Sequence, residues 1–221
     1  MKPFPIFLND LAGRPCIVFG SDHEAERKVK SLLEHDASVT VIHPELTEVL
    51  QQYFKAGDIA WRARSYKKGD LKHAFLAIAS EPNEVLNQAI WEEAEAENVL
   101  FNAMDDVPHC NFVSGSVIRR GPLVISISTS GCAPALSVRL RQRFEKEFGP
   151  EYEAYLNLMK LLRPVMSEVF TGFAERREKW YELVDGPLFE MVKARNRQGI
   201  DALLKQFLGN AHSIPAYRLH D

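Results

Sequence analysis

A short apolar run that ends in a glycine, followed at once by a helical pattern, constrains this chain more than any other feature. Residues 16–19 read Cys-Ile-Val-Phe, and Gly20 follows them. Apolar side chains then recur from Ala25 to Leu33 at the spacing of one helix face. A strand, a tight turn and a helix in this order open a dinucleotide-binding unit, in which the helix N-terminus faces the cofactor pyrophosphate.

The turn departs from the usual glycine-rich fingerprint at one position. The fingerprint is G-x-G-x-x-G/A, and residues 20–25 read Gly-Ser-Asp-His-Glu-Ala. Asp22 stands where a middle glycine would let a phosphate approach the backbone, and its carboxylate crowds and repels that phosphate. Ser21 and Glu24 also have the spacing of a capping box, by which a helix satisfies its own first N–H groups. The turn predicts the architecture and leaves NAD binding open.

Strand-like and helical segments alternate through the first half of the chain. The strand-like runs are 38–43, 59–63, 74–79 and 99–101, and the helical patterns are 24–35, 46–54 and 85–97. This alternation predicts parallel pairing and a doubly wound, Rossmann-like α/β sheet. Ligands bind beyond the carboxyl ends of such strands. The candidate cofactor-binding residues are therefore Gly20, Ser21, Asp22, His23, Glu24, Pro44, Glu45, Ser80 and Asn102.

The pattern changes after residue 106. Two β-rich runs, 111–118 and 123–128, follow each other without a helix, which predicts an antiparallel pair outside the nucleotide fold. From residue 151 onwards every signal is helical. We expect three parts, which are a Rossmann-like domain at 1–112, a β-containing segment at 113–149 and a helical domain at 150–221.

Composition excludes several classes of protein. A net charge of −3 over 221 residues argues against a general nucleic-acid-binding protein. The apolar runs are shorter than a membrane span, and the N-terminus lacks a signal-like segment. Cys16, Cys110 and Cys132 are widely spaced, which fits a reducing cytoplasm and indicates neither a zinc site nor a disulfide framework. We expect a cytoplasmic protein with no membrane or nucleic-acid partner and no bound metal.

Five motifs occur in an order and spacing that resemble a known family. They are FPIF at 4–7, AERK at 25–28, VTVIHPE at 39–45, NAMD at 102–105 and ISISTSGCAPAL at 125–136. Together they resemble the siroheme synthase N-terminal module, which is a precorrin-2 dehydrogenase and, in some members, also a sirohydrochlorin ferrochelatase. The resemblance covers roughly residues 3–145, and the helical tail agrees in length and character only.

The resemblance implies NAD-dependent oxidation of precorrin-2 to sirohydrochlorin in siroheme or haem biosynthesis and, in bifunctional members, insertion of Fe²⁺. It also implies an intertwined homodimer formed through the 113–149 segment. The family's essential acidic residue matches Asp105, which we predict to act as a general base. A serine that is phosphorylated in some members falls at Thr129, and Ser80-Glu81-Pro82 replaces the family's Thr-Asp-Asp-like turn.

The implied tetrapyrrole substrate carries many carboxylates, so we expect cations in its cleft. Arg119 and Arg120 in the turn between the two β runs are candidates, as are Arg139 and Arg143, which share a helix face. A solvated basic face is the alternative for each arginine. For Asp106 and His109, we expect a solvated loop rather than a role in proton transfer.

Two classes of function remain open from the sequence. The leading hypothesis is an NAD-dependent precorrin-2 dehydrogenase, with or without ferrochelatase activity. The alternative is an NAD-independent chelatase, or a non-catalytic tetrapyrrole-binding protein, on the same fold, because Asp22 places NAD binding in question.

Overall fold

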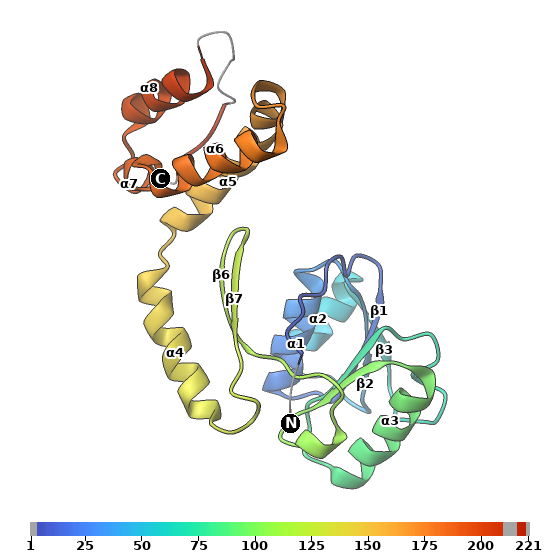
Figure 1. Cartoon of the computed structure of the whole chain (residues 1–221). Helices are drawn as coiled ribbons and strands as arrows, with labels where there is room; N and C mark the ends of the chain where they lie inside the picture. The colour runs from blue at the N-terminus through green and yellow to red at the C-terminus, as the bar shows by residue number, and fades with distance from the viewer. Residues whose placement is uncertain (1–3, 210–215, 220–221) are drawn as a thin grey trace. The chain divides into compact units, whose positions relative to one another are not determined.

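The computed structural model describes residues 4–209 and 216–219 and divides the chain into two compact units, Met1–Ser114 and Gly115–Asp221 (Figure 1). The first unit is a five-stranded parallel sheet with strand order β3-β2-β1-β4-β5. Its elements are β1 Pro15–Phe19, α1 His23–Leu33, β2 Ser38–Ile42, α2 Glu48–Ala56, β3 Ile59–Arg62, β4 Leu76–Ala79, α3 Glu84–Glu97, β5 Leu100–Ala103 and the 3₁₀ turn η1 Val107–His109. The predicted doubly wound sheet is confirmed.

Helices cover both faces of the sheet because alternate strand residues point to opposite sides. Cys16 and Val18 of β1 pack with α1 and α2, whereas Ile17 and Phe19 pack with α3. The strands therefore read as continuous apolar runs, as expected for a parallel sheet buried on two sides. Figure 1 shows α1 and α2 on one side of the sheet and α3 on the other.

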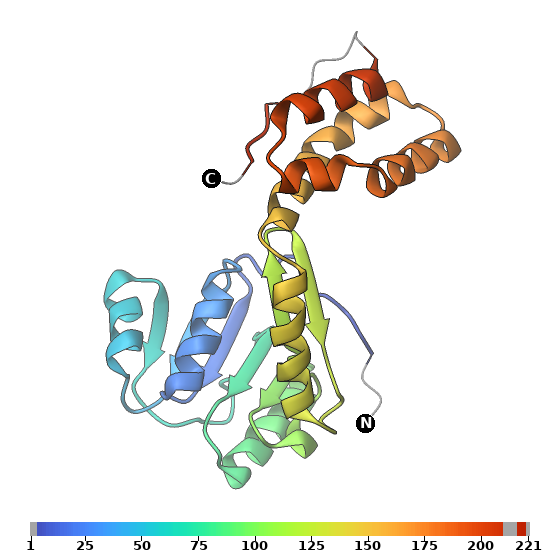
Figure 2. The ribbon, with the colours of Figure 1, turned by 90° about the vertical axis from the view of Figure 1, so that its left-hand side faces the viewer.

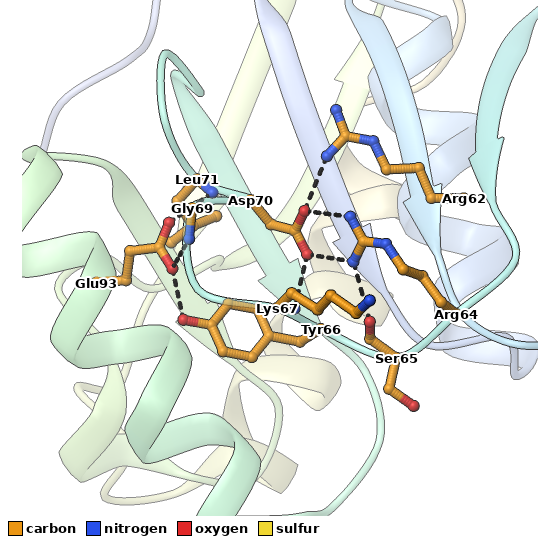
Figure 3. A network of polar contacts seen from close by, with 9 residues as sticks. All are labelled: Arg62, Arg64, Ser65, Tyr66, Lys67, Gly69, Asp70, Leu71 and Glu93. Atoms are coloured by element: carbon orange, nitrogen blue, oxygen red, sulfur yellow. Dashed lines mark hydrogen bonds and ion pairs between the residues drawn. The ribbon is translucent and has the colours of Figure 1, made fainter.

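Two buried carboxylates hold the loop between β3 and β4 (Figure 3). Asp70 accepts hydrogen bonds from Arg62 at 2.9 Å, from both terminal nitrogens of Arg64 and from Lys67 N–H at 2.8 Å. Glu93 of α3 accepts from the Tyr66 hydroxyl and from the main-chain N–H groups of residues 69 and 71. Two arginines compensate the charge of Asp70, and three hydrogen bonds from neutral donors satisfy Glu93, which allows both carboxylates to remain buried.

In its described residues, the second unit combines an antiparallel ribbon with five helices. Its elements are β6 Ser116–Arg120, β7 Leu123–Ile127, α4 Pro134–Glu147, α5 Glu151–Val169, α6 Phe173–Asp185, α7 Leu188–Lys193 and α8 Arg197–Leu208. The apolar core lies among α5–α8, around Leu158, Leu162, Met166, Leu188 and Leu204. The long helix α4 packs along β6 and β7, and both views show it beside the ribbon (Figures 1 and 2).

The first of the two predicted β runs was placed too early. It was expected from residue 111, whereas β6 begins at Ser116. Asn111 instead ties the chain to β5, because its side-chain oxygen accepts from Phe101 N–H at 2.7 Å and its amide donates to Val99 O at 2.9 Å. The antiparallel pairing of the two runs is confirmed. The division into three parts at residues 112 and 149 stays a prediction.

Candidate functional site

The first turn lies where the order of the strands reverses, which is the ligand crevice of an open α/β sheet. Phe19 at the end of β1 pairs in register with Ala79 at the end of β4, so Gly20 meets Ser80. Gly20 has a φ of +125°, and a Cβ atom there would collide with Ser80 Oγ. Only glycine fits both the backbone angle and the close approach. The glycine that the fingerprint predicted therefore has a clear structural role.

Asp22, not Ser21, caps α1, so the predicted capping box of Ser21 and Glu24 is wrong. Asp22 Oδ1 accepts from Ala25 N–H at 2.8 Å, the bond of an N-cap side chain to the third helical residue. Ser21 Oγ instead accepts from Thr47 N–H at 2.9 Å, and Glu24 pairs with Arg27 at 2.6 Å. The long-range contact to Thr47 fixes Ser21 outside the helix, so the N-cap lies one residue later than the capping-box spacing indicated, although α1 itself begins at His23, one residue before the predicted 24–35.

Glu81 is part of this turn, although sequence reasoning proposed Ser80 and not its neighbour. Glu81 Oε1 accepts from Ser21 N–H at 3.0 Å, and His43 Nε2 lies 3.3 Å from the same oxygen. The carboxylate thus joins the ends of β1, β2 and β4. The only sequence signal was the position of Glu81 two residues after β4, where crevice residues are expected.

The other proposed cofactor-binding residues near the carboxyl ends of the strands differ in exposure and in their contacts. Pro44 and Glu45 are exposed just beyond β2, and the main chain of Glu45 contacts the His43 ring. His23 is exposed on the first turn of α1. Asn102 lies within β5, and its amide donates to Phe112 O at 3.1 Å, which engages that group in a structural contact.

An open pocket of about 320 Å³ lies at the ends of β4 and β5, beside the start of α3. Its lining residues are Pro82, Asn83, Glu84, Asn87, Met104, Asp105 and Asp106. Asp105 comes two residues after the end of β5, is exposed, and has a φ of +57°, an angle that aspartate tolerates better than most side chains. The predicted general base therefore lies at the rim of a pocket at the carboxyl edge of the sheet.

Asp106 and His109 form a pair, so the expectation of a solvated loop is wrong for both. His109 Nδ1 lies 2.8 Å from Asp106 Oδ1, and their side chains keep only 16% and 15% of their surface exposed. Burial alone would raise the pKa of Asp106, but hydrogen bonds from His109 and Asn87 lower it below its ordinary value. Asp106 is thus held as a carboxylate by the groups that contact it.

Asn87 links this pair to the pocket. Its side-chain nitrogen donates to Asp106 at 3.0 Å, whereas its buried Oδ1 has no hydrogen-bond partner. A buried acceptor without a partner is uncommon in a folded protein. Sequence reasoning missed Asn87, which reads as an ordinary helix residue. Only its position one turn into α3, next to the end of β5, gives it this role.

The four arginines proposed for the substrate all lie in the second unit. Arg120 donates to the main-chain oxygens of Arg119, Glu145 and Phe148, so its guanidinium joins β6 to the end of α4. Arg119 is exposed on β6. Arg139 and Arg143 are exposed one turn apart on α4, and Arg139 contacts Gln142 at 3.1 Å. The α4 pair presents its charges to solvent, whereas Arg120 is engaged in packing.

Residues 4–209 and 216–219 contain no group of three or more His, Cys, Asp or Glu side chains arranged to hold a metal ion. Within the same ranges, no helix is long and apolar enough to cross a membrane.

Three family models match the chain in sequence order. They describe a putative NAD(P)-binding region at residues 7–116, the central part of a sirohaem biosynthesis protein at 120–147 and a sirohaem synthase dimerisation region at 152–208. This chain belongs to the siroheme synthase N-terminal family. The resemblance drawn from the five motifs is thereby confirmed.

Curated relatives agree with this assignment along almost the whole chain. The siroheme synthase of Actinobacillus pleuropneumoniae serotype 3 is 32% identical over 215 residues, which are 97% of this chain and 44% of that protein. The siroheme synthase of Nitrosospira multiformis is 34% identical over 219 residues, or 97% of this chain and 46% of that protein. The chain therefore spans about half the length of the curated relatives that it matches.

A solved structure shares the fold. It is described as SirC, precorrin-2 dehydrogenase, and it matches with a TM-score of 0.76 and 21% identity over 92% of this chain and 98% of that one. The likeness extends beyond the parallel sheet, because this coverage includes most of both units.

Proposed function

We propose that this chain is a precorrin-2 dehydrogenase that oxidises precorrin-2 to sirohydrochlorin with NAD⁺. The main support for the proposal is the position of Asp105 at the rim of the pocket beyond β5, in a chain of the siroheme synthase family. Loss of two hydrogens from the substrate requires an acceptor for a hydride and an acceptor for a proton. NAD⁺ supplies the first when bound, and the Asp105 carboxylate is the second.

The turn after β1 has most of the features that hold a dinucleotide. Gly20 brings the backbone close to the crevice, and the amides of His23 and Glu24 lie at the first two helical positions, where a helix has no carbonyl partner for its N–H groups. Against this, Asp22 and Glu81 place two carboxylates at the same turn. We infer that the residues fit NAD⁺ once Glu81 moves off the turn.

A second proton acceptor lies next to Asp105. His109 Nδ1 lies 2.8 Å from the Asp106 carboxylate, and the Asn87 amide donates to that carboxylate at 3.0 Å. Metal insertion into a tetrapyrrole displaces two pyrrole protons, so two neighbouring acceptors also suit a ferrochelatase step with Fe²⁺ as the substrate. Because of the pair formed by Asp106 and His109, we propose chelation as a second candidate function.

An Asp105→Asn variant tests the assignment of the base. Asparagine has nearly the same shape and also tolerates positive φ, so the fold should be retained. We expect kcat for precorrin-2 oxidation to fall by about 10²- to 10⁴-fold, the usual contribution of a general base. Sirohydrochlorin and NADH formation are followed by absorbance.

Asp36→Asn is a matched control for this variant. Asp36 is also exposed and also has a φ of +57°, but it precedes β2 at the opposite edge of the sheet. The kcat of Asp36→Asn for precorrin-2 oxidation should equal that of the wild type. Near-normal turnover by Asp105→Asn would remove Asp105 from the reaction.

We also propose that the chain forms a homodimer through the ribbon and α4. Ile118 is the one side chain of the ribbon that is fully buried among the described residues, and a two-stranded ribbon alone is only marginally stable. Val117, Leu136 and Val138 are 45%, 51% and 42% exposed. A second copy would cover these apolar side chains. The family's dimerisation region matches residues 152–208, so it supports a homodimer, while the placement of the interface on the ribbon and α4 rests on the exposed apolar side chains alone.

A further inference from the structure

The Ser21 amide belongs to the part of the turn where a dinucleotide-binding protein receives a phosphate, yet a carboxylate already occupies it. Ser21 N–H donates to Glu81 Oε1 at 3.0 Å. The pairing follows from the sheet, because β1 and β4 are in register at Phe19 and Ala79, and Ser21 and Glu81 each come two residues later. The contact therefore joins segments that are 60 residues apart.

The hydrogen bond between Glu81 and Ser21 can break without disturbing the fold. The Glu81 side chain is 40% exposed, so a change of rotamer can carry it into solvent without breaking a strand or a helix. Asp22 differs in this respect, because its bond to Ala25 N–H is the N-cap of α1 itself. His43 Nε2 lies 3.3 Å from Glu81 Oε1, so the docked carboxylate has a second polar neighbour.

A phosphate and the Glu81 carboxylate compete for the same place. Both are anions that accept from main-chain N–H groups, and both are stabilised by the positive end of the α1 dipole. With Glu81 docked, a phosphate at the turn would lose the Ser21 donor and would lie against a negative charge.

We propose that Glu81 occupies the phosphate position of the free protein and that a dinucleotide binds only by displacing it. The inference rests on the proposed NAD⁺-dependent function and adds a residue that sets the cofactor affinity. Glu81 acts as an internal competitor, so removal of its charge strengthens cofactor binding.

Calorimetric titration of the full chain with NAD⁺ tests the proposal. Glu81→Gln keeps an oxygen that can accept from Ser21 N–H and removes only the charge, so the turn should keep its conformation. We expect its NAD⁺ affinity to rise about tenfold at low salt, and the gain to shrink at high salt because part of it is screened repulsion. Glu81→Asp keeps the charge on a shorter side chain and should gain less than Glu81→Gln.

Glu48→Gln is the matched control. Glu48 is an exposed carboxylate in the first turn of α2, next to the Thr47 that bonds Ser21, and its loss changes the net charge by the same amount. Its NAD⁺ affinity should stay within about twofold of the wild type.

The outcomes separate the inference from the proposed function. Wild-type binding with an unchanged affinity in Glu81→Gln would overturn the inference and leave the dehydrogenase proposal intact. An equal gain in Glu48→Gln would also overturn it, because the effect would then come from net charge alone. An absence of NAD⁺ binding in all four proteins would overturn both.

Discussion

Replacing Asp70 with asparagine should destabilise the first unit strongly, because one buried carboxylate holds two arginines and a main-chain N–H (Figure 3). Asparagine has nearly the same size, so it leaves no cavity. It removes the charge that compensates Arg62 and Arg64, and its NH₂ group turns one acceptor of the network into a donor. The predicted effect is therefore electrostatic and does not arise from packing.

The solvent exposure of Arg62 and Arg64 determines how much stability the Asp70→Asn variant should lose. Breaking a buried ion pair on one side costs about 3–5 kcal/mol when the remaining charge stays buried. Arg62 and Arg64 keep 47% and 32% of their side-chain surface exposed, so water can solvate them after the change. We therefore expect a loss of about 2–3 kcal/mol in the free energy of unfolding. For a typical dependence of the unfolding free energy on urea concentration, this loss lowers the urea concentration at the midpoint of unfolding by about 1–2 M.

Urea denaturation followed by tryptophan fluorescence measures this loss. A Trp180→Phe background removes the reporter of the second unit, so that Trp61 and Trp91 report the first unit alone. Asp58→Asn is the control, because Asp58 is an exposed carboxylate in the turn between α2 and β3. It should change the unfolding free energy by less than about 0.5 kcal/mol. A similarly small change for Asp70→Asn would refute the reasoning.

The same network predicts a pH dependence. Burial alone would raise the pKa of Asp70, but the hydrogen bonds from Arg64 and Lys67 N–H hold it below its ordinary value. A carboxylate with a lowered pKa stabilises the fold fully above its unfolded pKa of about 4 and loses this contribution as the pH falls through its folded pKa. The stability difference between wild type and Asp70→Asn should therefore narrow below about pH 4. A constant difference would contradict the ion-pair account.

The remaining predictions concern the cofactor turn and the assembly. Asp22→Gly should raise NAD⁺ affinity by about tenfold at low salt, because it removes an anion from the turn while glycine still permits the helix start at a cost of a few tenths of a kcal/mol. Calorimetry at low and high salt measures this gain, and tight binding by the wild type would contradict it. Light scattering should give about twice the chain mass of 25.1 kDa, whereas a monomer at micromolar concentration would contradict the dimer.

The sequence predicted the sheet well because its signals are local. Each strand is a short apolar run and each helix has a periodic face, so element types and the parallel architecture follow from neighbours in the chain. Boundaries were less accurate where a long-range contact decides them. The N-cap of α1 is one example, because Ser21 is held outside the helix by Thr47, which lies 26 residues away, and Asp22 caps the helix instead. The sequence pattern at residues 21–24 does not indicate the contact between Ser21 and Thr47.

The candidate site was predicted only in part for a similar reason. Asp105 came from the family resemblance, and its place after β5 agrees with the expected edge of the sheet. Glu81 and Asn87 gain their roles from strand register and helix placement, which a single sequence does not reveal. The pair of Asp106 and His109 depends on a three-residue 3₁₀ turn, which is too short to give a periodic signal.

The charge of the pocket constrains how the proposed tetrapyrrole substrate could bind. Glu84, Asp105 and Asp106 line it, and none of its seven lining residues is a lysine or an arginine. A substrate with many carboxylates would be repelled by this surface, so the cations that neutralise it must come from other residues. Within the second unit, Arg139 and Arg143 are exposed on α4, whereas Arg120 is committed to main-chain oxygens. Under the proposed function, the acidic edge suits proton removal, and we predict that substrate affinity depends on cations outside this lining.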